Sequence, residues 1–296
     1  MCRDIIDNGT STEGEKVRPV WEDGTSAYTI KKFGVVNRYD LSKEFPALTL
    51  RRTGIKSCVD EMLWIWQKKS NNIHDLNSHI WDSWADEDGS IGKAYGYQMQ
   101  VKHQYKEGMM DQVDRVIYDL KNNPYSRRIM TNIYVHQDLH EMNLYPCAYS
   151  MTFNVTKEKD SDKLTLNGIL NQRSQDVLAA NNWNVCQYAV LLHMLAQVCD
   201  MKVGEFVDWA QRCFAPCFVN SICAPGSDTP PFCKRTASAA RPGTELFCVT
   251  VSICNHTHYS LCCQAFSGIY FHCGKNFFGR ISKGLEMPRL PTGAGV

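Results

Sequence analysis

The chain has 296 residues, of which 44% are hydrophobic and 21% charged, the length and composition of a globular protein with a full core. Lys and Arg number 32 against 31 Asp and Glu, which excludes the strongly basic surface expected of a general nucleic-acid or membrane-surface binder. No apolar run approaches a membrane span, and the first residues lack the apolar core of a signal peptide. We therefore expect a cytoplasmic protein with no membrane or nucleic-acid partner.

The composition changes near residue 207. Nine of the 14 cysteines lie after this point, and the same segment carries 8 Lys and Arg against 4 Asp and Glu. It contains no Cys-x-x-Cys pair, the spacing typical of a zinc site. We predict an ordered domain over residues 1–207 and a Cys-rich tail of unknown structure over residues 208–296.

Three helices are expected in the first part. Ser57, with an acid three residues later, resembles a capping box before the apolar run 62–66, and the helix that follows carries Glu61 in its first turn. Apolar residues recur at helical spacing from Met110 to Leu120 and stop at Asn122-Asn123-Pro124. The stretch 185–201 is apolar nearly all round, which predicts a buried core helix.

Three strands are expected between these helices, over residues 129–135, 149–155 and 164–170. The charged segment 157–163 separates the last two strands and is typical of a hairpin loop. Helices mixed with adjacent antiparallel strands predict an α+β layered fold.

Cys147 is the first candidate for chemistry. It follows Pro146, between a loop and a predicted strand, where a thiol could be held as a nucleophile or lie buried and inert. Neighbouring cations would favour the nucleophile by lowering its pKa. Arg173 and the pair Arg127-Arg128 are candidates. Adjacent arginines are usually a solvated surface pair, but they can also bind a phosphate through two hydrogen bonds each.

Two further patterns are ambiguous. Trp81 and Trp84 are three residues apart, so on a helix they share one face, which is normally core but could wall a pocket for a flat heterocycle. His136 and His140 have the spacing of a helical metal site. Because no third His or carboxylate has matching spacing, we predict no metal.

Taken in order, several short motifs resemble the thymidylate synthase family, from about Asp4 to Val207. The motifs are Arg18 before Glu22-Asp23-Gly24-Thr25; Asp60-Glu61-Met62-Leu63-Trp64; Ile80-Trp81-Asp82-Ser83-Trp84; Ala94-Tyr95-Gly96; Asp111-Gln112; Ser126-Arg127-Arg128; Tyr145-Pro146-Cys147; Gln172-Arg173-Ser174 with Asp176; Trp183-Asn184; and Gly204-Glu205-Phe206. The resemblance implies a layered fold with a mixed β-sheet packed by helices.

The resemblance also implies an activity, the reductive methylation of dUMP to dTMP by 5,10-methylenetetrahydrofolate with release of dihydrofolate. Cys147 as thiolate would add to C6 of the pyrimidine, with Arg173 as the cation that favours the thiolate. Glu61 and Tyr95 would organise water for proton transfer, and Asn184 would pair with the O4 and N3 edge of uracil.

The same resemblance implies how the ligands are held. The residues expected to bind dUMP, chiefly its 5′-phosphate, are Arg18, Gln172, Arg173 and Ser174, joined by Arg127 and Arg128 from the second subunit of a homodimer. Asp176 would hold the pterin ring of the folate, with Trp81 and Trp84 lining its pocket.

The chain also departs from the family pattern. Ala148, Ala180 and Trp183 stand where His, Gly and Phe are usual, and these positions are expected near the folate. After Val207 the expected Asp-x-His-x-Tyr motif, which would bind the sugar 3′-hydroxyl, is replaced by the run that begins at Asp208.

A shifted reading frame would produce this abrupt loss of the family pattern after Val207. The rival hypotheses are a fused unrelated domain and a metal-binding tail. We therefore expect an enzyme of reduced activity, and the alternative is an inactive nucleotide-binding shell or a misfolded product.

Overall fold

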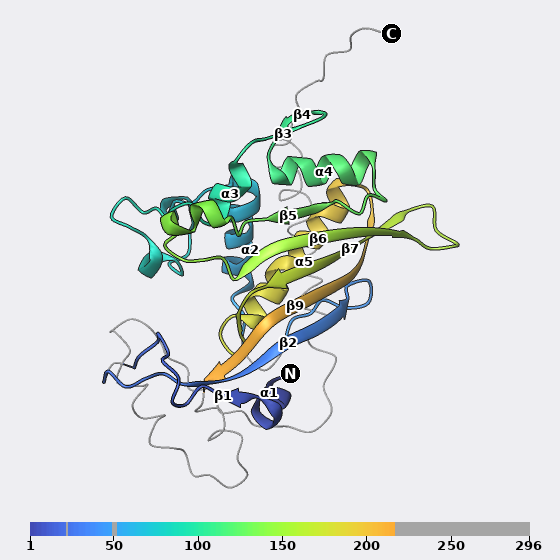
Figure 1. Ribbon diagram of the computed structural model, residues 1–296. Helices are drawn as coiled ribbons and strands as arrows, with labels where there is room; N and C mark the ends of the chain where they lie inside the picture. Colours follow the sequence, from blue (N-terminus) through green and yellow to red (C-terminus); the bar gives the residue numbers. More distant parts are fainter. Residues whose placement is uncertain (22, 49–51, 217–296) are drawn as a thin grey trace. The chain divides into compact units, whose positions relative to one another are not determined.

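The computed structural model describes residues 1–21, 23–48 and 52–216, all within the compact unit Met1–Val249 (Figure 1). Its helices are α1 (Cys2–Asn8), α2 (Ile55–Leu63), α3 (Gly96–Gln100), α4 (Gln112–Asn122) and α5 (Asn181–Val198), with a π-helix η1 (Trp64–Lys68) and 3₁₀ turns η2 (Ile73–Asp75), η3 (Asp82–Trp84) and η4 (His136–Glu141). Its strands are β1 (Thr10–Ser11), β2 (Thr29–Asp40), β3 (His103–Tyr105), β4 (Gly108–Met110), β5 (Met130–Asn132), β6 (Ala148–Lys157), β7 (Leu164–Gln172), β8 (Gln175–Asp176) and β9 (Lys202–Pro216).

A mixed sheet organises these elements. Its strands run in the order β1-β2-β9-β7-β6-β5, and β8 pairs with β9. Strands β7 and β9 are parallel, whereas β2–β9, β6–β7 and β5–β6 are antiparallel. Parallel strands need a crossover connection, which here includes α5. The predicted α+β fold with a mixed sheet packed by helices is confirmed.

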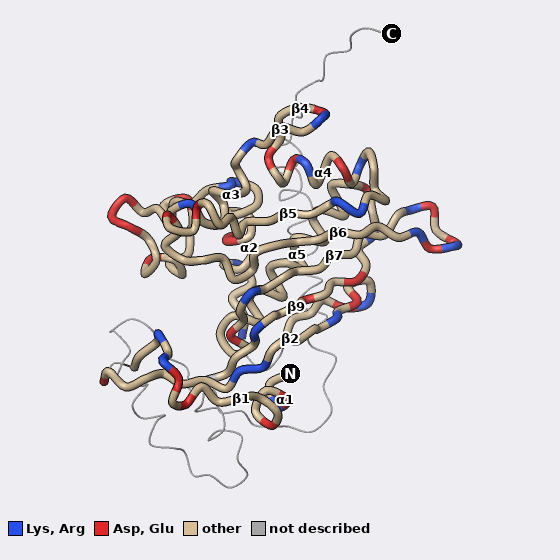
Figure 2. The backbone as a smooth tube through the Cα atoms, in the orientation of Figure 1, with Lys and Arg blue, Asp and Glu red and all other residues tan. Residues whose placement is uncertain are grey.

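Most of the predicted elements are present within a few residues of their expected bounds. The hairpin between β6 and β7 is confirmed, and Figure 2 shows charges gathered in its loop while the two strands are nearly free of them. The predicted cap of the first helix is wrong: α2 begins at Ile55 after Gly54, which places Ser57 inside the helix. Beyond Leu63 the apolar run continues as the π-helix η1 rather than as α-helix.

Strand β9 passes through residue 207 and continues to Pro216. Every second residue, Phe206, Asp208 and Ala210, is buried, which explains the continuation because one face of the strand stays packed against the interior. The division of the chain at residue 207 stays a prediction, and residues 217–296 lie outside the described part.

The main core lies between the sheet and the helices α2 and α5, which contact each other, and α5 also contacts β7 and β9. Helix α5 buries residues on most of its surface, including Val185, Tyr188 and Leu192, as its sequence predicts. A smaller cluster joins α1 to β9 through Ile5 and Cys213. No helix among the described residues is both long and apolar enough to cross a membrane.

The other face of the sheet carries apolar side chains that remain exposed. Val36 of β2 is directly opposite Trp209 of β9, and these side chains are 51% and 44% exposed. On neighbouring strands Met130 and Ile169 are exposed as well, and Thr152 lies between them in register. Several exposed apolar groups on one face of a sheet are typical of a surface that binds another protein.

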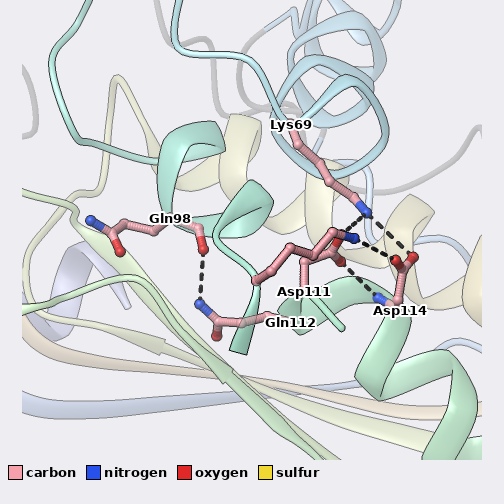
Figure 3. Close-up of polar contacts among 6 residues, drawn as sticks. Lys69, Gln98, Asp111, Gln112 and Asp114 are labelled. Atoms are coloured by element: carbon pink, nitrogen blue, oxygen red, sulfur yellow. Dashed lines mark hydrogen bonds and ion pairs between the residues drawn. The ribbon is translucent and has the colours of Figure 1, made fainter. Parts of the chain in front are cut away.

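Asp111 ties the α3–α4 region together (Figure 3). Its buried carboxylate accepts from the backbone N–H of Asp114, which caps α4, and from Lys69 Nζ at 2.8 Å and Lys102 Nζ at 2.7 Å. The next residue, Gln112, donates to the carbonyl of Gln98 at 3.1 Å. Burial alone would raise the pKa of Asp111, but the Asp114 N–H and the two lysines lower it below its usual value.

Asp111→Asn is expected to lower the free energy of unfolding at pH 7 by about 3 kcal/mol, because Asn keeps the cap but leaves Lys69 without its buried counter-charge. Since folding lowers the carboxyl pKa, its stabilisation is present above the unfolded pKa and is lost as the pH falls through the folded pKa. The difference between the two proteins in urea denaturation should therefore shrink toward acid pH. Asp114→Asn, at a more exposed carboxylate, is the matched control and should cost less than about 1 kcal/mol.

Candidate active site

Cys147 lies immediately before β6, next to the end of β7. Gln172 of β7 is in register with Ala148, so Arg173 follows directly beside the cysteine. The backbone N–H of Arg173 donates to the Cys147 carbonyl at 2.8 Å, and its Nη2 lies 3.6 Å from Sγ. The same guanidinium donates to the carbonyls of Tyr145 and Pro146, which fixes its direction.

Opposing effects act on the Cys147 thiol. Burial raises its pKa above the ordinary value, while the positive charges of Arg173 and Arg18 lower it in part. Arg18 is exposed in the segment between β1 and β2, yet its charge acts on the thiol, so this segment borders the site. The thiol therefore lies against the Arg173 guanidinium, and the charges of Arg173 and Arg18 both favour its thiolate form.

Tyr95 contacts the backbone of Cys147. Its hydroxyl oxygen accepts from the Cys147 N–H at 3.2 Å, and burial raises its pKa well above the usual value. Tyr95 has a φ of 44°, a conformation that non-glycine residues rarely adopt, immediately before α3. The next residue must be glycine, because a Cβ on Gly96 would lie 1.9 Å from the Ser70 carbonyl oxygen.

Glu61 is a buried carboxyl at the centre of a second group. Oε1 accepts from Trp81 Nε1 at 2.6 Å, and Oε2 accepts from Gln187 Nε2 at 3.0 Å and from the indole N–H of Trp183. Burial raises the pKa of Glu61, and these three donors oppose the shift by favouring the charged form. The Trp81 ring also packs edge-on against Tyr95, with centroids 5.1 Å apart, so the two groups adjoin.

Three side chains joined by hydrogen bonds, the amides of Asn184 and Gln172 and the carboxyl of Asp208, lie near Cys147 on the face of the sheet that α5 covers. Asn184 Nδ2 donates to Gln172 Oε1 at 2.7 Å, and Gln172 Nε2 donates to Asp208 Oδ1 at 2.7 Å. Burial raises the pKa of Asp208, while hydrogen bonds from Gln172, Gln175 and Asn37 lower it in part. Asn184 is only partly buried, so of these three hydrogen-bonded side chains its amide is the one that a ligand can reach.

The remaining predicted residues lie at the edges of this region. Asp176 is partly exposed, and its Oδ1 accepts from the N–H groups of Leu178 and Ala179, which shapes the turn into α5. Ser174, between β7 and β8, is also partly exposed. Trp81 and Trp84 do not share a helix face: η3 begins only after Trp81, which turns inward to Glu61, while Trp84 is 40% exposed.

Arg127 and Arg128 are not brought to Cys147 within one chain. They are exposed in the turn before β5, and β5 pairs with β6 so that Met130 is opposite Thr152. At about 3.3 Å per residue, this turn is roughly 20 Å along β6 from Cys147. His136 and His140 are exposed on η4, and within the described ranges no group of three His, Cys, Asp or Glu could hold a metal.

A cysteine beside a guanidinium, with a buried carboxyl and an amide nearby at one end of a mixed sheet, is an arrangement that can support chemistry by a cysteine nucleophile. Comparison with known proteins makes the class specific. The sequence profile described as thymidylate synthase matches residues 1–214, so the chain belongs to the thymidylate synthase family, whose members are methyltransferases.

Individual relatives agree. Thymidylate synthase from Bacillus subtilis subsp. natto is 43% identical over 212 residues, 70% of this chain and 74% of the relative. The synthase of Bacillus phage phi3T is 42% identical over the same shares of both chains. Among solved structures, the thermostable thymidylate synthase A from Bacillus subtilis matches with a TM-score of 0.69 and 38% identity, covering 74% of this chain and 79% of that one. These matches favour the enzyme hypothesis over an inactive shell.

Three contributors to the site were not predicted in the roles that the structure shows. Gln187 is an amide within the apolar run 185–192, four positions after Trp183 and so on the same helical face, and this spacing is the signal that indicates it. Trp183 stands out as a departure from the family pattern, but the sequence does not show that its N–H reaches Glu61. Asp208 was assigned to the tail, although it lies at a buried position of β9.

Trp183→Phe removes one N–H donor from Glu61 and keeps the aromatic ring. Because that donor favours the charged carboxylate, the pKa of Glu61 should rise further, and the limb of the pH profile of kcat/KM that reports this group should move to higher pH. The free energy of unfolding should fall by about 1–3 kcal/mol. Trp209→Phe, at an exposed indole, is the control, and an unchanged pH profile in Trp183→Phe would contradict the prediction.

Proposed function

We propose that this chain converts dUMP to dTMP, with 5,10-methylenetetrahydrofolate as the co-substrate and dihydrofolate as the second product. The observation that carries this proposal is the contact between Arg173 and the Cys147 thiol, next to the amide of Asn184. One guanidinium can favour the thiolate while the amide beside it holds the pyrimidine that the thiolate attacks.

The nucleophilic step depends on Cys147. Its thiolate forms a bond to C6 of the uracil ring, which places negative charge on C5 and O4 and makes C5 a nucleophile. C5 would then bond to the one-carbon unit of methylenetetrahydrofolate, and loss of the C5 proton would break the bond between that carbon and the folate nitrogen, leaving a methylene group on the pyrimidine. Transfer of a hydride from the tetrahydrofolate to this methylene would expel the Cys147 thiolate from C6, which gives dTMP, dihydrofolate and the restored thiolate.

Proton transfer is assigned to Glu61 and Tyr95. Burial raises the pKa of the Glu61 carboxyl while three N–H donors favour its charged form, so opposing effects act on a group that would both take and give protons. Tyr95 is linked to it through the Trp81 ring and touches the Cys147 backbone, so water held by these two groups would be close to the reacting carbons.

Phosphate and folate sites follow from the partly exposed residues around Cys147. Arg18 and Arg173 act on the thiol and can also bind a dianionic phosphate, with the Ser174 hydroxyl as a further donor. Asp176 and Trp84 are open to a ligand at the edge of the site, a carboxylate for ring N–H groups and an indole for a flat ring. These residue types fit a reduced folate.

The six cysteines of the described part, including Cys147, are free thiols, which fits a reducing cytoplasm.

Cys147→Ser tests the proposed reaction directly. Because an alcohol is far less ionised than a thiol, dihydrofolate formation, followed by absorbance, should fall by a factor on the order of 10⁴. Binding of dUMP should persist, since the groups assigned to phosphate and base are unchanged. Cys199→Ser, at another partly buried thiol, should keep the activity. Full activity in Cys147→Ser would refute the proposed nucleophile.

A homodimer completes the site in this proposal. Arg127 and Arg128 lie far from Cys147 in their own chain, and the exposed apolar side chains on one face of the sheet, among them Val36 and Trp209, offer a face for a second copy. If two sheets pack with these faces together, the arginines of one chain can reach the phosphate bound by the other.

Subunit mixing tests this arrangement. Cys147→Ser and the double variant Arg127→Ala/Arg128→Ala should each have little activity alone, because every dimer then lacks either the nucleophile or the partner's cations. After mixing and reassembly, mixed dimers contain one intact site, so about a quarter of the activity of the unmodified protein should return. A mixture that stays inactive while sedimentation shows mixed dimers, or an active arginine variant, would contradict the shared site.

A further inference from the structure

Asp208 is a fully buried carboxyl in β9 that the proposed reaction does not use. Its two oxygens accept from two different amides, Oδ1 from Gln172 Nε2 at 2.7 Å and Oδ2 from Gln175 Nε2 at 3.1 Å. Both glutamines are buried as well, with side chains on strands adjacent to β9. A charged group in such a position requires an explanation, because its burial raises its pKa and disfavours its charged form.

The carboxylate determines the direction of each amide. An ionised carboxylate has only acceptors, so each glutamine must turn its NH₂ toward Asp208 and its oxygen away. The oxygen of Gln172 then accepts from Asn184 Nδ2 at 2.7 Å, and that of Gln175 accepts from the Cys213 thiol at 3.5 Å. Asp208 thus sets the direction of the Asn184 amide through two hydrogen bonds, one from Gln172 to Asp208 and one from Asn184 to Gln172.

The direction of Asn184 matters for base recognition, a step that rests on the proposed function. With one N–H given to Gln172, the amide offers a ligand its oxygen and its remaining N–H. These match the N3–H donor and O4 acceptor of uracil, whereas cytosine presents an acceptor at N3 and a donor at the 4-amino group. An Asn184 amide turned by 180° would match cytosine instead.

We propose that Asp208 is a positioning residue that makes the site specific for uracil, acting through Gln172 on Asn184. Asp208→Asn has nearly the same shape but offers a donor as well as an acceptor, so Gln172 and Asn184 can both turn over. The preference for uracil over cytosine is then lost, because nothing fixes the direction of the two amides. The groups assigned to phosphate remain in place.

The experiment compares the dissociation constants of dUMP and dCMP for the full chain by titration calorimetry. The unmodified protein should bind dUMP more tightly, and in Asp208→Asn the ratio of the two constants should fall by about tenfold, the effect of exchanging one hydrogen-bond pair. Gln172→Met removes the amide that joins Asp208 to Asn184 and should reduce the ratio similarly. It replaces Asp208→Asn as the test variant if Asp208→Asn does not fold. Asp119→Asn removes a buried carboxyl that binds Arg115 on α4 and should leave the ratio unchanged.

The outcomes separate two failures. An unchanged ratio in a folded Asp208→Asn protein, or in Gln172→Met, overturns the role of Asp208 and leaves the nucleotide site standing. A ratio that falls equally in Asp119→Asn also overturns it, since the effect would then be one of general stability. If the unmodified chain binds neither nucleotide, the proposed function fails, and the role of Asp208 in it fails too.

Discussion

The parallel pairing of β7 and β9 is the constraint on which the site depends. Two parallel neighbours cannot be joined by a tight turn, so the chain must leave β7, cross the sheet and return along β9. Helix α5 makes this crossing and packs on the strands that it connects. The end of β7 therefore delivers Arg173 to Cys147, and the start of α5 delivers Asn184 to the same end of the sheet.

A second consequence of this crossover is that polar side chains are enclosed in an apolar interior. Glu61 and Asp208 are both buried, and leaving either charge unpaired would cost several kcal/mol. Each is instead surrounded by N–H donors from tryptophan, glutamine or asparagine side chains. Neutral donors can hold a carboxylate without cancelling its charge, so the group remains able to change its protonation or to direct its neighbours. Stability and chemistry thus depend on the same hydrogen bonds.

Much of the fold could be predicted from periodicity. The hairpin β6–β7 and helix α5 follow from alternation and from an apolar run, since both patterns depend on local burial. The parallel neighbour β9 could not be predicted in this way, because its pairing joins segments separated by a helix. The predicted end of regular structure at residue 207 reflects this difficulty: the segment beyond it is mixed in composition, but its alternate residues remain covered.

The candidate site was predictable to a similar degree. Motif order located Cys147, Arg173, Glu61 and Asn184, because each stands in a recognisable short segment. It did not indicate which N–H groups reach Glu61, and it suggested one shared face for Trp81 and Trp84 that the short turn η3 does not provide. Contacts of this kind depend on the direction of single side chains, which spacing along the chain does not determine.

Strand β9 also bears on where the family-like part of the chain ends. Beyond residue 207 it pairs with β2 as far as Pro216 and with β8 at Cys213 and Phe214. Cys213 belongs by composition to the Cys-rich segment, yet its side chain is buried in the cluster with Ile5 and donates to Gln175. A chain ending at residue 207 would lose most of the pairing between β2 and β9 and all of the pairing of β8, and would lack the carboxyl that orients Gln172. The first residues of the atypical segment are therefore part of the sheet that holds the site, whatever the origin of the residues after them.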